Sequence, residues 1–421
     1  MSPTFKSLYV RNYRIYAVGA FVSNIGTWMQ RVAQDWLILQ LTGSGTALGI
    51  TTGLQLLPAL LLSPIAGVVA DRYPKRQILR LTQLAMALPA AVLGILAVTG
   101  TVQAWHIYAI AFVFGVGAAF DAPARQSFVV EMVGGDDLAN ALGLNSASFN
   151  SARMIGPAFA GVMIAALGSG VMATGWVILL NALSYLAVYI SLNRLDGKQL
   201  YPAPLASRGK GAIREGVRYV RSRPDLILIL ASVFFVGTFG LNFQMTSALM
   251  ATEVFDKGAS EYGILGSIMA IGSLAGALTA ARNPRPRAGI VVLAGVAFGL
   301  IEALAGLMPG YLTFALISPF LGFSALTMMT SANSAIQMTT GPSMRGRVSA
   351  LYVMIFLGGT PFGAPLIGWI GEEYGARWTL ILGGLASVVG IAISALVFAR
   401  MQGLKRPRFR TVRAYTAKAI T

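Results

Sequence analysis

The sequence predicts an all-α integral membrane protein with twelve transmembrane helices in two pseudo-symmetric lobes of six helices each. Apolar residues make up 56% of the 421 positions and charged residues only 11%, whereas a soluble domain carries about 25% charged residues. Such a small charged fraction cannot cover the surface of a water-soluble protein. We therefore expect that lipid replaces water as the solvent around most of the chain. The apolar segments and the placement of the basic residues give the number of spans and their direction.

A helix needs about 20 mostly apolar residues to cross the hydrocarbon core. Windows of that size place the spans at 13–40, 46–70, 76–99, 104–127, 138–167, 171–193, 225–251, 261–281, 288–308, 311–337, 346–371 and 376–400. The long connection after the sixth span divides the chain. We therefore expect an N-terminal six-helix lobe at 1–193, a cytoplasmic basic amphipathic loop at 194–224, a C-terminal six-helix lobe at 225–400 and a basic cytoplasmic tail at 401–421.

The basic residues test this assignment. If the N-terminus is cytoplasmic, only Lys257 and Arg377 of the 32 basic residues lie on the outer side, and only Arg31 and Arg153 lie deep inside spans, away from their ends. Basic residues next to spans stay in the cytoplasm, so we expect a multi-pass protein of the bacterial cytoplasmic membrane with both termini inside. The net charge of +17 is then an orientation signal, and no nucleic-acid partner is needed to explain it.

The long loop has a pattern of its own. Ile213, Val217 and Val220 share one helical face, and arginines occupy the neighbouring face. This spacing predicts a basic amphipathic helix on the anionic inner leaflet. The alternative is a solvated linker with some helicity.

The two halves look duplicated. The glycines that recur are Gly156, Gly161 and Gly168 in the fifth span and Gly363, Gly368 and Gly375 in the eleventh. Prolines lie close to both sets. Repeats of this kind build transporters whose halves rock around a site near the bilayer midplane.

Enzymatic chemistry is not indicated. The chain has no cysteine and one histidine, His106, beside Trp105 at an expected helix start. Disulfides, thiolate nucleophiles and Cys/His metal sites are thereby excluded. No Walker A sequence is present either, so we expect no metal, no cofactor and no use of ATP.

One loop carries a recognisable motif. After the second span the chain reads Gly67-Val-Val-Ala-Asp71-Arg72-Tyr-Pro-Lys75-Arg76, which resembles the signature loop G-x-x-x-D-R-x-G-R-R of the major facilitator superfamily. The runs RNYRIYAVGAFVSNIGTWMQRVAQDW, FDAPARQSFV and REGVRYVRSRP are similar to the bacterial group of enterobactin exporters and macrolide efflux proteins. The resemblance covers nearly the whole chain and implies secondary transport of small molecules.

The loop also predicts a gating latch. Gly67 allows close helix packing, and Asp71 is expected against the amide-rich start of the eleventh span. Arg76 needs a carboxylate, and Asp121 on the fourth span is the expected partner. The residues assigned to the latch are Gly67, Asp71, Arg72, Lys75, Arg76, Asp121 and Arg125. The alternative is that the basic residues serve topology alone.

The fifth span contains Gly156, Pro157 and Gly161, which partly resemble the Gly-Pro element of drug/proton antiporters. A proline removes one backbone hydrogen bond and bends a helix. With the other runs, this kink favours export as the direction of transport.

Ionisable residues inside spans usually face a cavity and mark ion or substrate paths. Asp35, one turn after Arg31, is the first candidate for proton coupling, and a static Arg31–Asp35 pair is the alternative. Arg153 lies near mid-membrane and is expected to pair with an acid or with an anionic substrate. Glu302 completes the candidates, although its position also suits a side chain that reaches to the outer interface.

Residues of four spans are candidates for a cavity lining, with interhelical hydrogen bonding as an equal explanation. They are Asn24, Trp28, Asn145, Asn150, Asn242, Gln244, Asn333 and Gln337.

The leading hypothesis is a monomeric, proton-coupled exporter of amphipathic or lipophilic molecules such as drugs, antibiotics or siderophores. Its partners would be the lipid bilayer, a small-molecule substrate and protons. The alternatives are a facilitator or lysolipid flippase of the same fold, and a membrane sensor or assembly protein that transports nothing.

Overall fold

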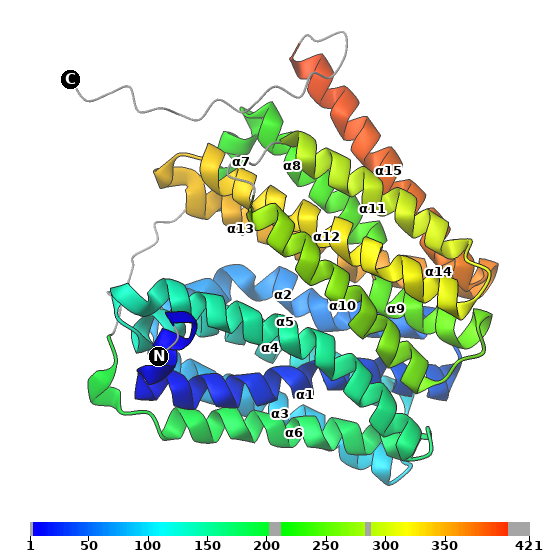
Figure 1. The fold of residues 1–421 in the computed structure, drawn as a ribbon, viewed down its shortest axis with the longest axis horizontal. Coiled ribbons are helices and arrows are strands. Elements are labelled where there is room, and N and C mark those ends of the chain that lie inside the picture. The colour runs from blue at the N-terminus through cyan, green and yellow to red at the C-terminus, as the bar shows by residue number, and fades with distance from the viewer. Residues whose placement is uncertain (1–2, 202–211, 283–287, 403–421) are drawn as a thin grey trace. The chain divides into compact units, whose positions relative to one another are not determined.

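The computed structural model describes residues 3–201, 212–282 and 288–402, and every regular element in these ranges is helical (Figure 1). The first six long helices are α1 (Arg11–Thr42), α2 (Gly45–Arg72), α3 (Lys75–Val98), α4 (Ala104–Met132), α5 (Gly135–Ala166) and α6 (Val171–Asn193). The following elements are α7 (Ala212–Arg221), α8 (Pro224–Phe235), η3 (Val236–Gly240), α9 (Phe243–Leu249), η4 (Met250–Val254), α10 (Ala259–Ala281), α11 (Ala288–Gly306), α12 (Tyr311–Thr339), α13 (Pro342–Gly358), α14 (Thr360–Tyr374) and α15 (Ala376–Met401). Two short 3-10 turns, η1 (Pro3–Tyr9) and η2 (Gly197–Gln199), flank the first six.

Helical segments occupy each of the twelve predicted spans, and the all-α membrane fold is confirmed. Ten of the segments in the described ranges are both long and apolar enough to cross a bilayer. The other two, α1 and α5, are 32 residues each and therefore long enough, but more polar.

The polarity of α1 has a structural reason. Its polar side chains Ser23, Gln30, Gln34 and Asp35 are all buried, with exposed fractions of 7% or less. Gln30 accepts a hydrogen bond from the side-chain amide of Asn181 on α6, and Asp35 accepts one from the hydroxyl of Tyr262 on α10. The helix therefore keeps these polar side chains inside the protein instead of presenting them to lipid.

By their contacts, the helices form two compact units. The first comprises Met1–Arg208 with Asp256–Ser267, and the second Gly209–Phe255 with Ile268–Thr421. Helix α10 contributes to both, because its first turns pack with the first unit and its remainder with the second.

The two units repeat the same helix pairings. In the first unit α3 packs on α6 and on α4, and α1 packs on α6 and α5. The second unit has the matching pairs, in which α11 packs on α15 and α12 and the seventh span, made of α8 and η3, packs on α15 and α14. The matching helix pairings of the two units agree with the repeated glycine pattern of the sequence.

The repeated glycines occupy equivalent places. A Cβ on Gly156 would lie 3.0 Å from the carbonyl oxygen of Ile25 in the first span, and one on Gly363 would lie 1.8 Å from that of Thr238 in the seventh. Gly168 and Gly375, which follow these helices, share φ angles of +96° and +95°. That backbone region is open to glycine and costly for other residues.

The seventh span is not one continuous helix. It passes from α8 into the π-helical turn η3, breaks at Leu241 and Asn242, and resumes as α9 and the π-helical turn η4. The side-chain amide of Asn242 donates to the carbonyl oxygen of Thr238 at 3.0 Å and so takes up a backbone acceptor at the break. Such local π turns satisfy backbone groups that a broken helix would otherwise leave without partners.

The eleventh span is also interrupted. Helix α13 ends at Gly358 and α14 begins at Thr360, immediately before Pro361. Pro361 has no amide hydrogen to continue the helix, and the hydroxyl of Thr360 donates to the carbonyl oxygen of Gly237 at 3.3 Å. The two breaks therefore contact one another within the second unit.

The amphipathic helix predicted in the long loop is present as α7. It packs on α13, where a Cβ on Gly216 would lie 3.2 Å from the Cβ of Arg347. Glu215 and Arg347 form an ion pair of 2.8 Å beside this contact. The predicted tail at 401–421 falls outside the described residues from position 403 onward.

The closest helix contacts predict which glycines are essential to the fold. A Cβ on Gly272 of α10 would lie 1.8 Å from the carbonyl oxygen of Pro319 on α12. Because backbone would have to move, Gly272→Ala should lower the free energy of unfolding by about 1–3 kcal/mol, measured by denaturation of the purified protein in detergent. Gly143→Ala is the control, since its Cβ would meet nothing within 4 Å. Equal stability of the two variants would contradict the assigned packing.

Candidate functional site

Asp35 lies inside the first unit. Its side chain on α1 is 7% exposed, and the hydroxyl of Tyr262 on α10 donates to its Oδ2 at 2.9 Å. Trp36 stacks beside Tyr262 with ring centroids 6.4 Å apart. Tyr262 is itself 1% exposed, so a buried hydroxyl and a buried carboxyl meet where α10 enters this unit.

The Gly-Pro element of α5 holds the start of α10 in this place. A Cβ on Gly263 would lie 2.3 Å from the carbonyl oxygen of Pro157, and one on Gly161 would lie 2.4 Å from that of Ala259. The amide of Ala158 donates to the hydroxyl of Ser267 at 3.1 Å. The element expected to act as a kink therefore also forms the surface on which α10 and its Tyr262 are positioned.

The two basic residues inside spans face one aromatic ring. The guanidinium carbons of Arg31 and Arg153 lie 4.8 Å and 5.7 Å from the centroid of Trp28. Phe149 meets the same ring edge to face at 5.8 Å. In the described part of the chain, Nε of Arg31 has no hydrogen-bond partner. A static Arg31–Asp35 pair stays the alternative to a coupling role.

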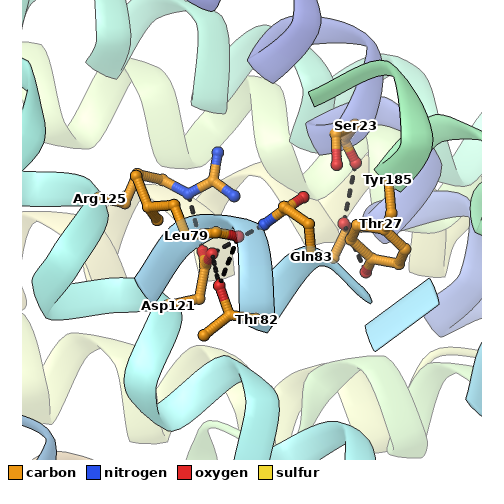
Figure 2. A network of polar contacts seen from close by, with 8 residues as sticks. All are labelled: Ser23, Thr27, Leu79, Thr82, Gln83, Asp121, Arg125 and Tyr185. Atoms are coloured by element: carbon orange, nitrogen blue, oxygen red, sulfur yellow. Dashed lines mark hydrogen bonds and ion pairs between the residues drawn. The ribbon is translucent and has the colours of Figure 1, made fainter. Parts of the chain in front are cut away.

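A second polar network surrounds Asp121 on α4 (Figure 2). Its Oδ1 accepts from the hydroxyl of Thr82 at 2.9 Å and from the amide of Gln83 at 2.8 Å, and its Oδ2 accepts from Nε of Arg125 at 2.8 Å. The pair is shielded from solvent, with 9% of the Asp121 side chain and 18% of the Arg125 side chain exposed. Asp121 thereby joins α3 to α4.

The expected pairing of Arg76 with Asp121 is wrong. Arg76 instead donates to three backbone carbonyl oxygens at the end of α6, those of Leu192 at 2.7 Å, Asn193 at 3.1 Å and Leu195 at 3.0 Å. The last carbonyls of a helix have no partner inside it and carry partial negative charge. A guanidinium therefore finds a complementary site there without a carboxylate.

The neighbouring basic residue has the carboxylate partner. Lys75 and Glu131 form an ion pair of 2.9 Å in which each side chain is only 8% exposed. This contact joins the start of α3 to the end of α4. Of the remaining latch residues, Gly67 and Asp71 on α2 are partly buried and Arg72 is exposed.

Glu302 does not reach outward. It is 1% exposed in α11, so the expectation that it extends to the outer interface is wrong. Its carboxyl lies between Gly240 of η3 and Gly383 of α15, at 2.9 Å and 3.6 Å from the points that their Cβ atoms would occupy. It belongs to the second unit.

The proposed lining residues differ in their exposure. Asn242 is 3% exposed, and its side-chain amide bonds within its own span at the helix break, whereas the alternative expected a bond to another helix. Asn24, Trp28, Asn145, Asn150 and Gln244 are partly buried, and Asn333 and Gln337 are exposed and bonded to each other at 2.9 Å.

An apolar groove of about 870 Å³ contains none of the candidate residues. It lies on the first unit between α3, α6 and the end of α5, and is lined by Leu84, Ala87, Leu88, Ala91, Met163, Leu167, Trp176, Leu179, Leu180, Ala182, Leu183 and Leu186.

Sequence reasoning missed Tyr262, Glu131, Thr82 and Gln83. Glu131 lay beyond the expected end of the fourth span at 127, whereas α4 continues to Met132. Only 15 acidic residues occur in the chain, and a search for a basic partner for each would have considered Glu131. Tyr262, distant in the sequence, gave no comparable signal.

Two halves of six spans, broken seventh and eleventh helices and buried charges within the lobes define a membrane transporter of the major facilitator fold. Solved structures agree. A bacterial homologue of the human lysosomal transporter Spinster has a TM-score of 0.69 and 16% identity over 97% of this chain and 100% of its own. The nucleoside transporter NupG has a TM-score of 0.73 and 14% identity over 92% and 99% of the two chains.

The chain belongs to the transmembrane secretion effector family of the major facilitator superfamily, whose sequence model matches residues 2–407. The multidrug efflux pump Tap of Mycolicibacterium fortuitum is 28% identical over 91% of this chain and 95% of its own length. The staphyloferrin A transporter of Staphylococcus aureus is 24% identical over 88% and 92%. Macrolide efflux protein A of Streptococcus pyogenes is 23% identical over 93% and 97%. The protein is thus a transporter and not an enzyme.

The Asp121 network makes a prediction for stability. Asp121→Asn would leave the Arg125 guanidinium without its counter-charge in a shielded place, so unfolding should become easier by about 3–5 kcal/mol. Glu215→Gln, which removes the exposed ion pair with Arg347, should cost at most about 1 kcal/mol. Denaturant titration of both purified variants measures the difference. If Asp121→Asn proves as stable as Glu215→Gln, the network does not hold α3 and α4 together.

Proposed function

We propose that the chain exports amphipathic or lipophilic small molecules, such as drugs, antibiotics or siderophores, as a proton antiporter with alternating access. Three relatives are named for multidrug efflux, staphyloferrin A transport and macrolide efflux, which supports export and this substrate class. The observation that carries the coupling is the buried Asp35, held by a hydroxyl from α10.

Proton binding at Asp35 would compete with that hydroxyl. A hydrogen bond to an ionised carboxylate is about twice as strong as one between neutral groups, so the Tyr262 bond is strongest when Asp35 has lost its proton. Protonation removes this charge assistance and weakens the attachment of α10 to the first unit. Arg31, one turn away on the same helix, adds a positive charge close to this carboxyl. Loading and release of a proton thereby change how firmly α10 is held.

The substrate would contact the arginine-flanked ring of Trp28. Its indole and the ring of Phe149 offer aromatic surface, while Arg31 and Arg153 add positive charge beside it. Planar amphipathic molecules stack on such surfaces, and an acidic group on the substrate would pair with a guanidinium. Asn24 and Asn145, both partly buried on α1 and α5, would add hydrogen bonds to the substrate.

The loop between α2 and α3 would close the cytoplasmic side. The Lys75–Glu131 pair and the three bonds of Arg76 hold this loop rigidly against α4 and α6, so Asp71 is presented at a set position. We propose that Asp71 docks at the start of α13, where helix amides favour an anion.

We further propose a monomer in the bacterial cytoplasmic membrane with both termini inside, as the basic residues indicate. Arg214, Arg218 and Arg221 are exposed on α7. They would face the anionic headgroups of the inner leaflet while the other side of α7 rests on α13.

The coupling assignment predicts loss of active export in Asp35→Asn. Its amide cannot release a proton, so uphill transport of a fluorescent dye in everted vesicles should fall to the background of empty vesicles. Tyr262→Phe keeps the carboxyl and should reduce the rate without abolishing it. Asp256→Asn, at an exposed acidic residue, is the matched control and should transport normally.

Two results would refute this assignment. Normal pumping by Asp35→Asn would exclude Asp35 from coupling. Dye flux that an uncoupler leaves unchanged would exclude proton antiport altogether and indicate the facilitator or flippase. If no substrate moves and the protein copurifies with a stable partner, the sensor or assembly role gains support.

The latch predicts a change in accessibility. Because the chain has no cysteine, Asn145→Cys provides a single thiol on α5. Adding Asp71→Asn should remove the docked anion and open the cytoplasmic side, so a membrane-impermeant thiol reagent should label Asn145→Cys several-fold faster in everted vesicles. Asp256→Asn in the same background should not alter the rate. Identical labelling with and without Asp71→Asn would show that no latch forms.

A further inference from the structure

The carboxyl of Glu302 is enclosed by small residues of the second unit. A Cβ on Gly240 would come within 2.9 Å of Oε2 and within 3.0 Å of the hydroxyl oxygen of Ser387. A Cβ on Gly383 would lie 2.7 Å from the carbonyl oxygen of Phe239 and 3.6 Å from Oε1. The absence of side chains at these two glycines leaves the space beside the carboxyl, where the Ser387 hydroxyl and the Phe239 carbonyl oxygen lie close by and the ring edge of Phe298 borders the Gly240 side.

The groups around this carboxyl accept hydrogen bonds and do not donate to it. Ser387 gives its hydroxyl hydrogen to the carbonyl oxygen of Gly383 at 2.9 Å. Within the described residues, Oε2 of Glu302 has no hydrogen-bond partner, and none of the ion pairs found there includes Glu302. On the same helix break, the buried Oδ1 of Asn242 also lacks a donor.

An ionised carboxylate in such a place is very costly. Burial without a partner costs many kcal/mol, so the group must be neutralised by a bound cation or proton. Broken transmembrane helices are suited to this, since their unwound carbonyls coordinate sodium ions or protons. Oxygen ligands suit hard cations, and one carboxylate balances one positive charge.

We propose that Glu302, with the carbonyl oxygen of Phe239 and the hydroxyl of Ser387, binds a monovalent cation that is either a proton or a sodium ion. The ligands come from α11, η3 and α15, so binding joins the broken seventh span to its neighbours in the second unit. A role of this site in coupling would rest on the function proposed above. Binding of the cation depends only on the contacts described here. The site is separate from Asp35, which belongs to the first unit.

The test uses the purified full chain and needs no transport. In the sodium arm, thermal unfolding is followed while NaCl replaces N-methylglucamine chloride at constant ionic strength. A bound ion raises the unfolding temperature with its concentration. In the proton arm, infrared difference spectra in H2O and D2O detect the C=O stretch of a protonated carboxyl. Glu302→Gln is compared with Glu373→Gln, which removes an exposed acid from the same unit.

One of the two signals should be present in the wild type and in Glu373→Gln and missing from Glu302→Gln. Sodium stabilisation identifies a sodium site, and a carboxyl band identifies a proton site. The proposal is overturned if both signals are the same in wild type and in Glu302→Gln. It is also overturned if the wild type shows neither signal.

Two further variants keep the carboxyl and guard against misfolding of Glu302→Gln. Ser387→Ala removes one oxygen and should weaken sodium binding by about tenfold or more, as loss of a supporting partner commonly does, or shift the carboxyl band. Gly240→Ala fills the space beside Oε2 and should have the larger effect. Wild-type behaviour of both would overturn the proposed ligands. Loss of export in Glu302→Gln without a change in either signal would overturn this binding site and leave a role of Glu302 in transport alone.

Discussion

Every polar group that enters the bilayer must find its partner within the protein, and this constraint underlies the structure. No water is available in the hydrocarbon to compensate an unpaired carboxylate or carbonyl. The first unit meets this constraint in part with ion pairs such as Asp121 with Arg125 and Lys75 with Glu131. At Glu302 a buried carboxyl oxygen lacks a partner, and an acid inside a membrane usually marks an ion or substrate path.

Close helix contacts determine where those polar groups can meet. Without a hydrophobic drive between helices in lipid, packing depends on small residues that let backbones approach. Gly161 and Gly263 bring α5 and α10 together so that Tyr262 reaches Asp35. Gly240 and Gly383 leave the space that the Glu302 carboxyl occupies. The same residue type therefore serves packing in one unit and site formation in the other, and the duplicated pairings explain why both units possess such contacts.

The sequence predicted the helices far better than their partners. Hydropathy located every span, because crossing a bilayer demands a long apolar segment whatever lies beside it. It did not reveal that Asn242 interrupts the seventh span, since π turns keep nearly the same composition as an α-helix. The sequence paired Arg76 with Asp121 because the two have opposite charges and fall at the same membrane depth. Charge alone cannot distinguish Asp121 from the carbonyl end of α6, because both are negative and only the fold places one of them within reach.

By itself, the sequence determined the all-α membrane class, the two related halves and the short list of charged residues inside the spans, of which Asp35 and Glu302 are the acidic members. These follow from composition and periodicity, which a bilayer constrains at every position. Only the tertiary structure decided that Tyr262 from α10 meets Asp35, that Arg31 and Arg153 share Trp28, and that Glu302 is enclosed and not at an interface. Such contacts join residues far apart in the chain, and their distances depend on how glycines allow helices to pack, which no local pattern records.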